Sequence, residues 1–337
     1  MSTTTQIDPA LTLLLMEASL QAYNAYDGDH PARCVSNAVT APAGWDFVEC
    51  FTGVDSVFFK EEQRVESFGV VFRSKTAPYT YIFAFRGTVA LLDAIEDAAF
   101  FEGKDTFLPF GATRPPDPGA AVASGFWSIY TESTSQVTSM QAQVFALLAK
   151  YQASARPASR LLVTGHSLGS ALAVLFSLDL AFSQYRSLPA PHVNFACPRV
   201  GNAPFARLYD GQPQQQSLAT RTVRVQNTYD LVPCGPPTWW PFEYRHVTDA
   251  FLIAFYNKNA GWLDPRAKFY DHQAFNYQAV LACAFKNKAR VCVNDALFVP
   301  ADGETLVSLA PDPNTVCSLF AEADRARQAA YEARRKG

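Results

Sequence analysis

One serine of this sequence stands where its hydroxyl could act as a nucleophile. Ser167 is the centre of the run Gly165-His166-Ser167-Leu168-Gly169, a G-x-S-x-G motif. A serine hydroxyl reacts only when it is held exposed beside a base, and a sharp turn from a strand into a helix holds it in that way. The apolar run 161–164 and the helical pattern 170–174 flank the motif and predict such a turn. These flanks favour a nucleophile over a bystander serine in a glycine-rich turn.

A serine nucleophile needs a histidine that accepts its proton, and the chain has 5 histidines. When the nucleophile sits on a strand-to-helix turn, the acid and then the histidine follow it in the chain. This order excludes His30. We expect His166, beside the serine, to point the other way, and His192 opens a predicted strand ahead of any acid loop. His246 and His272 remain. His246 lies in a strand-like stretch that suits a structural histidine, whereas His272 lies at a loop-to-helix junction that can present a base, so we favour His272.

The histidine in turn needs a carboxylate that orients it. Asp230 follows the strand-like run 222–226. Catalytic groups of open α/β sheets gather at the carboxyl ends of strands, so Asp230 is the predicted acid. Asp264 and Asp271 are the rivals, and Asp271 is better explained as the N-cap of the helix that follows it.

The flanking segments predict strands that alternate with helices. The expected strands cover 69–73 and 79–85, which suit a hairpin, and 161–164, 192–196 and 222–226, while the expected helices cover 9–25, 122–151, 167–183 and 318–335. Alternation of this kind indicates a mostly parallel sheet with crossover helices on both faces. We therefore predict one α/β domain over 1–337, with insertions.

The composition and charge of the chain limit the kinds of partner and the location that we expect. The net charge is −3, from 28 basic and 31 acidic residues, so we expect no nucleic acid partner. No apolar run is long enough to span a membrane. The start of the chain has no positively charged region, so we expect no signal peptide and, by default, a cytoplasmic location, although a mature secreted form would begin in the same way.

The 7 cysteines do not have the spacing of metal ligands, so we expect no metal and no other cofactor. Cys34 and Cys50, and Cys283 and Cys292, could each close a local loop. We interpret the cysteines instead as buried or free thiols.

Six short motifs occur in an order that resembles one known family. They are Phe85-Arg86-Gly87-Thr88, Ser124-Gly125-Phe126, Gly165-His166-Ser167-Leu168-Gly169, Pro198-Arg199-Val200-Gly201-Asn202, Asn227 with Asp230-Leu231-Val232-Pro233, and His272 with Tyr277. Over about residues 65–285 the chain resembles the class 3 lipases, the family of the fungal triacylglycerol lipases. The resemblance implies the α/β-hydrolase fold.

The resemblance also implies an oxyanion hole. The backbone N–H of Thr88, together with its hydroxyl, and the backbone N–H of Leu168 would donate to the developing oxyanion. Asp97, nine residues after Thr88, would steady that hydroxyl. A lid is implied over about 89–110, where 91–101 is amphipathic, but an ordinary surface helix has the same pattern. Ala94 stands where many members of the family have a lid tryptophan.

Together these features predict a serine carboxylic-ester hydrolase that acts through an acyl-enzyme. The resemblance makes a triacylglycerol lipase the first choice, with an ester or lipid substrate at a lipid–water interface. The alternatives on the same site are a phospholipase A1 and an esterase for short, aryl or polymeric esters. An alternative of another class is a catalytically dead relative that binds lipid.

Overall fold

The computed structural model describes most of the chain, namely residues 7–55, 64–88, 103–211, 217–238, 242–253, 255–257, 271–287 and 298–300. Three predicted features fall outside these residues: Asp97, the helix at 318–335, and the segment 89–102, which makes up most of the lid implied at 89–110.

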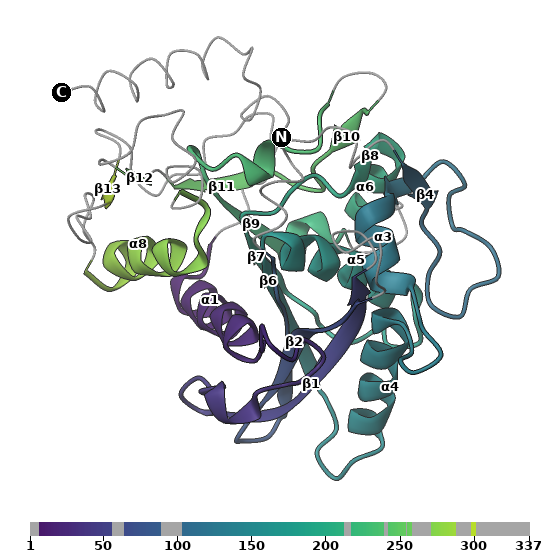
Figure 1. Cartoon of the computed structure of the whole chain (residues 1–337), viewed down its shortest axis with the longest axis horizontal. Helices are drawn as coiled ribbons and strands as arrows, with labels where there is room; N and C mark the ends of the chain where they lie inside the picture. The colour runs from purple at the N-terminus through teal and green to yellow at the C-terminus, as the bar shows by residue number, and fades with distance from the viewer. Residues whose placement is uncertain are drawn as a thin grey trace.

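A seven-stranded sheet forms the centre of the molecule (Figure 1). Its strands in spatial order are β1 (Trp45–Asp55), β2 (Arg64–Ser74), β3 (Thr80–Phe85), β6 (Arg160–His166), β7 (His192–Phe195), β9 (Thr222–Asn227) and β11 (Ala250–Ile253). The first three strands pair antiparallel, and every pairing from β3 to β11 is parallel. The predicted hairpin is confirmed as β2 and β3, and the mostly parallel sheet is confirmed as well. Strand β1 was not predicted.

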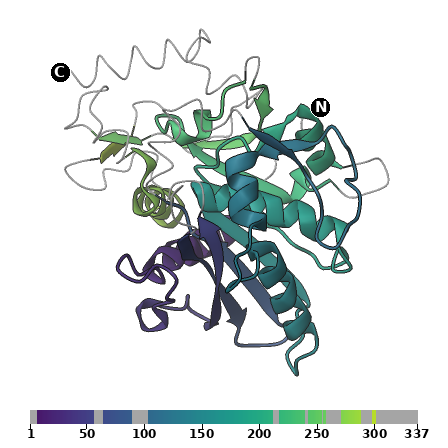
Figure 2. The same cartoon turned by 45° about the vertical axis from the view of Figure 1, so that its right-hand side comes forward.

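Helices cover both faces of this sheet (Figures 1 and 2). One face carries α1 (Pro9–Asn24) and α8 (Ala274–Asn287), and the other carries α3 (Ser124–Thr131), α4 (Met140–Gln152) and α5 (Leu168–Phe182). The described residues also form α6 (Ala203–Asp210), the 3₁₀ turns Ser36–Ala38, Ala219–Arg221 and Val232–Cys234, a small sheet of β4 (Lys104–Thr106), β5 (Ala121–Ala123), β8 (Gly201–Asn202) and β10 (Tyr244–Arg245), and the pair β12 (Phe255–Asn257) and β13 (Phe298–Pro300).

The single long helix predicted over 122–151 is wrong. The segment begins in strand β5 and continues as two helices, α3 and α4, which are separated by residues 132–139. The separating stretch is rich in serine and threonine, whose side chains compete with a helix for backbone groups. The Thr134 hydroxyl accepts the N–H groups of Gln136 and Val137 at 3.1 Å each, and the Ser139 hydroxyl caps α4 by accepting from the Ala142 N–H. Periodicity alone therefore missed the break.

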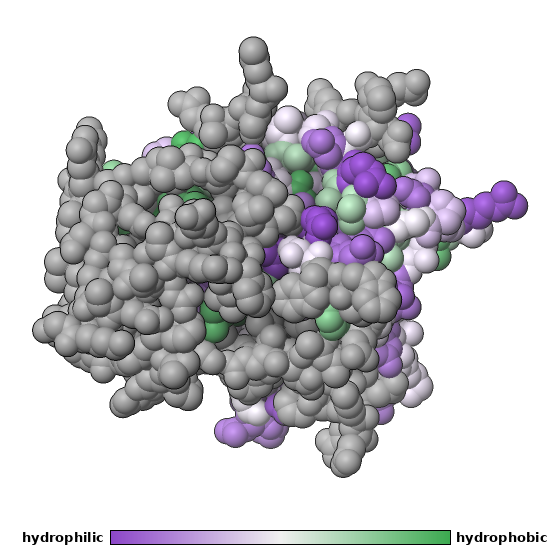
Figure 3. Space-filling model, turned by 90° about the horizontal axis from the view of Figure 1, so that it is seen from above, coloured by the Kyte–Doolittle hydropathy of each residue, from purple (hydrophilic) through white to green (hydrophobic). Residues whose placement is uncertain are grey.

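Among the described residues no helix is both long and apolar enough to cross a membrane. Seen from above, the coloured surface is largely hydrophilic, and its hydrophobic residues show only in small separate groups (Figure 3). The large hydrophobic side chains exposed in the described part of the chain are Leu108, Phe110 and Phe275.

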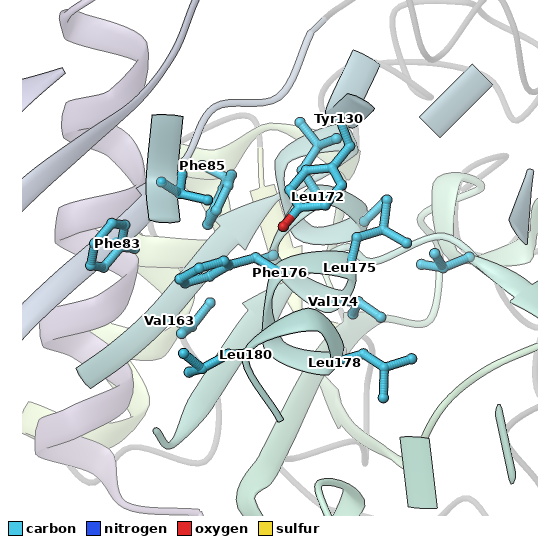
Figure 4. Close-up of a cluster of buried hydrophobic side chains, with 14 of the residues drawn as sticks. Phe83, Phe85, Tyr130, Val163, Leu172, Val174, Leu175, Phe176, Leu178 and Leu180 are labelled. Carbon is cyan, nitrogen blue, oxygen red and sulfur yellow. The ribbon is translucent and has the colours of Figure 1, made fainter. Parts of the chain in front are cut away.

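Alternate side chains of the strands enter two cores. On β3, Tyr81, Phe83 and Phe85 face α3, α4 and α5, while Ile82 and Ala84 face α1 and α8. Helix α5 is buried over Leu168 to Leu180, and its Phe176 ring packs on Phe83 and Phe85 with centroids 5.2 and 5.6 Å apart (Figure 4). This packing fixes the start of α5 beside the end of β3.

A disulfide joins Cys34 to Cys50, so the interpretation of these two cysteines as thiols is wrong. The bond ties the segment after α1 to strand β1, and Cys34 also forms an isolated β-bridge with Tyr26. Spacing alone could not decide the pairing, because it depends on how β1 returns past α1. Cys197 and Cys234 remain thiols, outside any disulfide, and Cys292 lies outside the described residues.

We expect the disulfide to stabilise the fold. Closing a loop of 16 residues should contribute about 2–4 kcal/mol to the free energy of unfolding, chiefly by restricting the unfolded chain. The variant Cys50→Ser should show this loss in urea denaturation. A reductant should lower the midpoint of the wild type and leave that of the variant where it is. An unchanged wild-type midpoint after full reduction would contradict the assignment.

Candidate active site

Ser167 occupies a strained turn between β6 and α5. It precedes the first residue of α5 and has φ 60° and ψ −130°, a left-handed conformation that non-glycine residues rarely adopt. The strand, the sharp turn and the helix follow one another as the G-x-S-x-G motif predicts. The side chain is therefore aimed by the backbone turn and not by a choice of rotamer.

The glycines of the motif are explained by backbone contacts. A Cβ on Gly165 would lie 2.3 Å from the carbonyl oxygen of Gly169, and a Cβ on Gly169 would lie 2.2 Å from that of Phe85. A Cβ on Gly87 would lie 2.6 Å from the carbonyl oxygen of His166. Any side chain at these three positions would separate β3, β6 and α5. Glycine is thus required for the close approach that forms the turn.

The structure brings together Ser167, His272 and Asp230. Nε2 of His272 lies 2.7 Å from Oγ of Ser167, and its Nδ1 lies 2.9 and 3.0 Å from the two carboxylate oxygens of Asp230. A carboxylate only accepts, so Nδ1 carries the imidazole proton and Nε2 is left to accept from the serine hydroxyl. The side chains are buried, which keeps bulk water from competing for these hydrogen bonds. Such an arrangement can move a proton from Ser167 to His272.

Sheet topology explains how three distant segments meet. Strands β3, β6 and β9 run parallel, so the segments after them emerge at one edge of the sheet. Asp230 follows β9, and His272 comes just before α8. Asn227, at the end of β9, joins these parts because its side chain Nδ2 donates to the carbonyls of Phe255 and Asp271 at 3.0 and 2.9 Å.

Tyr277 is a residue of the site to which the sequence assigned no role. Its hydroxyl donates to Oδ2 of Asp230 at 2.7 Å and accepts the backbone N–H of Asn227 at 2.9 Å. The other carboxylate oxygen accepts the N–H of Val232 at 2.9 Å. The spacing of Tyr277 from His272, about one helical turn, was the available signal. These donors hold the carboxylate in place.

The other buried histidines are structural in their surroundings. Nε2 of His246 donates to the carbonyl of Pro233 at 2.9 Å, and burial, with Arg224 and Arg199 nearby, lowers the pKa of His246 well below its usual value. Burial also lowers the pKa of His192 to about 3. The expectation that His166 points away from the site is wrong. Its Nε2 donates to the backbone carbonyl of His272 at 2.8 Å, and the two rings lie with their centroids 4.7 Å apart.

The turn after β3 lies against the nucleophile. Phe85 pairs with Gly165 across β3 and β6, so the next residues, Arg86 to Thr88, pass beside Ser167. The buried Arg86 guanidinium donates to the carbonyls of Gly87 at 2.9 Å and of Ser67 at 2.8 Å. It also forms an ion pair of 2.5 Å with Glu66. The Gly87 carbonyl belongs to the same peptide as the Thr88 N–H, so Arg86 fixes the direction of that donor.

Leu168, the second predicted donor, is the first residue of α5. The first N–H groups of a helix have no acceptor within the helix, so they are available to an anion. Thr88 is half-buried at the end of its turn. Asp97, which the resemblance places behind Thr88, lies outside the described residues, and its role stays a prediction.

The motif Pro198–Asn202 contacts the loop that follows Asp230. The backbone N–H of Arg199 donates to the carbonyl of Gly235 at 2.8 Å. Its buried side chain donates to the carbonyls of Pro236, at 2.8 Å, and Cys234. The run Pro198–Asn202 therefore positions the acid loop.

A family model described as lipase (class 3) matches residues 82–239. This part of the chain contains the turn after β3, the G-x-S-x-G turn and Asp230. Over these residues, just under half of its length, the chain is similar to the class 3 lipases.

Individual relatives are similar to this chain over part of their length. Phospholipase A1-II 6 of Oryza sativa subsp. japonica is 34% identical over 171 residues, which are 46% of this chain and 40% of the relative. A secreted mono- and diacylglycerol lipase of Malassezia globosa is 32% identical over 168 residues, 45% of this chain and 50% of the relative. The chain thus spans half or less of these curated relatives.

A solved structure supports the fold of this chain. Lipase II from Rhizopus niveus superposes with a TM-score of 0.51 at 22% identity, over 78% of this chain and 91% of that one. The likeness confirms the α/β-hydrolase fold that the motifs implied.

Tyr277→Phe should weaken the hold on Asp230. The variant loses a hydrogen bond to a charged group, so kcat should fall about 10-fold or more while KM changes little. Tyr130→Phe is the matched control, because the Tyr130 hydroxyl donates to the buried carboxylate of Asp179 at 3.0 Å, farther along α5. Steady-state hydrolysis of p-nitrophenyl butyrate would measure both variants. Equal kcat values for the wild type and Tyr277→Phe would show that Asp230 needs no such support.

Proposed function

We propose that this chain is a serine carboxylic-ester hydrolase. The observation that supports this most directly is the 2.7 Å contact between Oγ of Ser167, on its left-handed turn, and Nε2 of His272, whose other nitrogen faces Asp230. Strained backbone conformations are found mainly at functional sites, so a serine in such a turn beside a buried, oriented imidazole is typical of a nucleophile. The match of residues 82–239 to the class 3 lipase family model supports this activity.

The proposed reaction proceeds in two halves. Ser167 attacks the ester carbonyl carbon while its proton passes to Nε2 of His272. The backbone N–H groups of Thr88 and Leu168, with the Thr88 hydroxyl, stabilise the oxyanion. His272 then returns the proton to the leaving alcohol, and the acyl group stays on Ser167. A water molecule, deprotonated by His272, attacks the acyl-enzyme and releases the carboxylic acid. Asp230 stabilises the imidazolium in both halves.

Acylglycerols are the proposed substrates, with a triacylglycerol as the first choice. The similarity to a mono- and diacylglycerol lipase supports an acylglycerol, and that to a phospholipase A1 makes a glycerophospholipid the second candidate. Phe275, three residues after His272, is 52% exposed and supports contact with apolar acyl chains or a lipid–water interface at this side of the site. A lid over 89–110 and one catalytic domain over 1–337 complete the proposal.

We further propose that the protein works outside the reducing cytosol. The disulfide between Cys34 and Cys50 is at odds with a cytoplasmic location, because such bonds persist in oxidising compartments. The relative from Malassezia globosa is named as secreted, which agrees with this placement.

Ser167→Ala tests the proposed activity. The variant should fold normally but hydrolyse neither p-nitrophenyl butyrate nor a triolein emulsion, because the acyl-enzyme is proposed to form on the Ser167 hydroxyl. A fluorophosphonate should inactivate the wild type and add to Ser167 when the peptide is mapped by mass spectrometry. An adduct on another serine, or an inert wild type, would overturn the proposal. Comparison of triolein with phosphatidylcholine vesicles would decide the substrate class.

Thr88 tests the oxyanion hole. If the hydroxyl donates along with the backbone N–H, Thr88→Ala should lower kcat about 10²-fold with little change in KM, and Thr88→Ser should keep most of the activity. Asp97→Asn should show a weaker form of the same defect. Equal kcat for the wild type and Thr88→Ala would leave Thr88 as a backbone donor at most.

A further inference from the structure

Helix α1, which lies outside the segment that matches the family, places the side chain of Tyr23 at the site. Tyr23 lies in the last turn of α1, whereas the family match begins at residue 82. Its hydroxyl is 2.8 Å from Nδ1 of His166, and a Cβ on Gly87 would lie 2.2 Å from it. The hydroxyl therefore sits between the neighbour of the nucleophile and the turn that leads to Thr88.

The direction of each hydrogen bond in this group follows from its chemistry. Nε2 of His166 faces the backbone carbonyl of His272 at 2.8 Å, and a carbonyl can only accept, so Nε2 carries the proton. Burial and the adjacent His272 hold the pKa of His166 well below its usual value, so the ring is neutral and Nδ1 is a bare acceptor. Burial raises the pKa of Tyr23, which keeps its phenol protonated and able to donate. The Tyr23 hydroxyl therefore donates to Nδ1 of His166, and Nε2 of His166 donates to the His272 carbonyl.

We propose that Tyr23 and His166 are positioning residues that hold the backbone of His272 so that its ring meets Ser167. Tyr23 fixes the tautomer and orientation of His166, and His166 then fixes the His272 carbonyl. The ring centroids of His166 and His272 also lie 4.7 Å apart, so the two imidazoles pack against each other. This inference rests on the proposed function, since it assigns His272 the role of base.

The experiment is a double-mutant cycle on ester hydrolysis. Tyr23→Phe keeps the ring but loses the donor, and we expect kcat to fall about 5- to 10-fold with KM within about 2-fold. His166→Leu should cost more. Because Tyr23 acts through His166, the double variant should be no slower than His166→Leu alone, whereas independent structural defects would add. His166→Gln, whose amide nitrogen can still donate to the His272 carbonyl, should recover most of the loss.

Tyr209→Phe is the matched control. The Tyr209 hydroxyl lies 3.1 Å from Nδ1 of the buried, neutral His192. His192 is the first residue of β7, whereas Ser167 follows the last residue of the neighbouring β6, so the two lie at opposite ends of these parallel strands. The variant Tyr209→Phe, like Tyr23→Phe, loses a buried hydrogen bond to a histidine and should be less stable than the wild type. Its kcat should equal that of the wild type. A wild-type kcat in Tyr23→Phe, additive losses in the double variant, or an equal kcat loss in Tyr209→Phe would each overturn the inference. Should His166→Leu fail to fold, Tyr23→Phe and Tyr209→Phe still decide it. An inactive wild type would instead refute the proposed function.

Discussion

The start of helix α5 approaches the ends of β3 and β6 so closely that backbone touches backbone. Gly165 and Gly169 permit this contact, since a Cβ on either would lie within 2.3 Å of a carbonyl oxygen. Between them the chain has to reverse within one residue, and Ser167 takes the left-handed conformation that does so. The cost of that conformation is met by the buried packing of α5, whose Phe176 is held against β3. Every other group of the site is placed relative to this turn.

A connected set of buried hydrogen bonds carries that placement outward. Asn227 binds the backbone on both sides of the segment 258–270, and Tyr277 links the Asn227 N–H to Asp230. The end of β9 and the start of α8 are thereby joined beneath the imidazole. Because each of these groups is buried, a missing partner would leave a polar atom without water, and this penalty favours one arrangement over its neighbours.

Residues before the family match complete the frame. The Arg86 guanidinium, which fixes the Gly87 peptide, lies 3.9 Å above the ring of Tyr26, and its ion-pair partner Glu66 comes from β2. Tyr26 pairs with Cys34, and the disulfide ties Cys34 to β1. The N-terminal segment is therefore part of the structure that supports the candidate site. Removal of the residues that precede β1 should disturb the site as well as the core.

The sequence by itself determined the turn at Ser167, the mostly parallel sheet, and that His272 and Asp230 lie beside that serine. It could do so because these depend on local signals: glycines at a bend, apolar periodicity, and the order of strands in an α/β sheet. Only the tertiary structure decided the contacts between distant segments. The break between α3 and α4, the pairing of Cys34 with Cys50, the orientation of His166 and the parts played by Tyr23, Tyr277 and Arg199 all depend on which chains pass one another in the folded protein. A side chain's partner across the core leaves no mark on its sequence neighbours, because burial and hydrogen bonding are properties of the packed state.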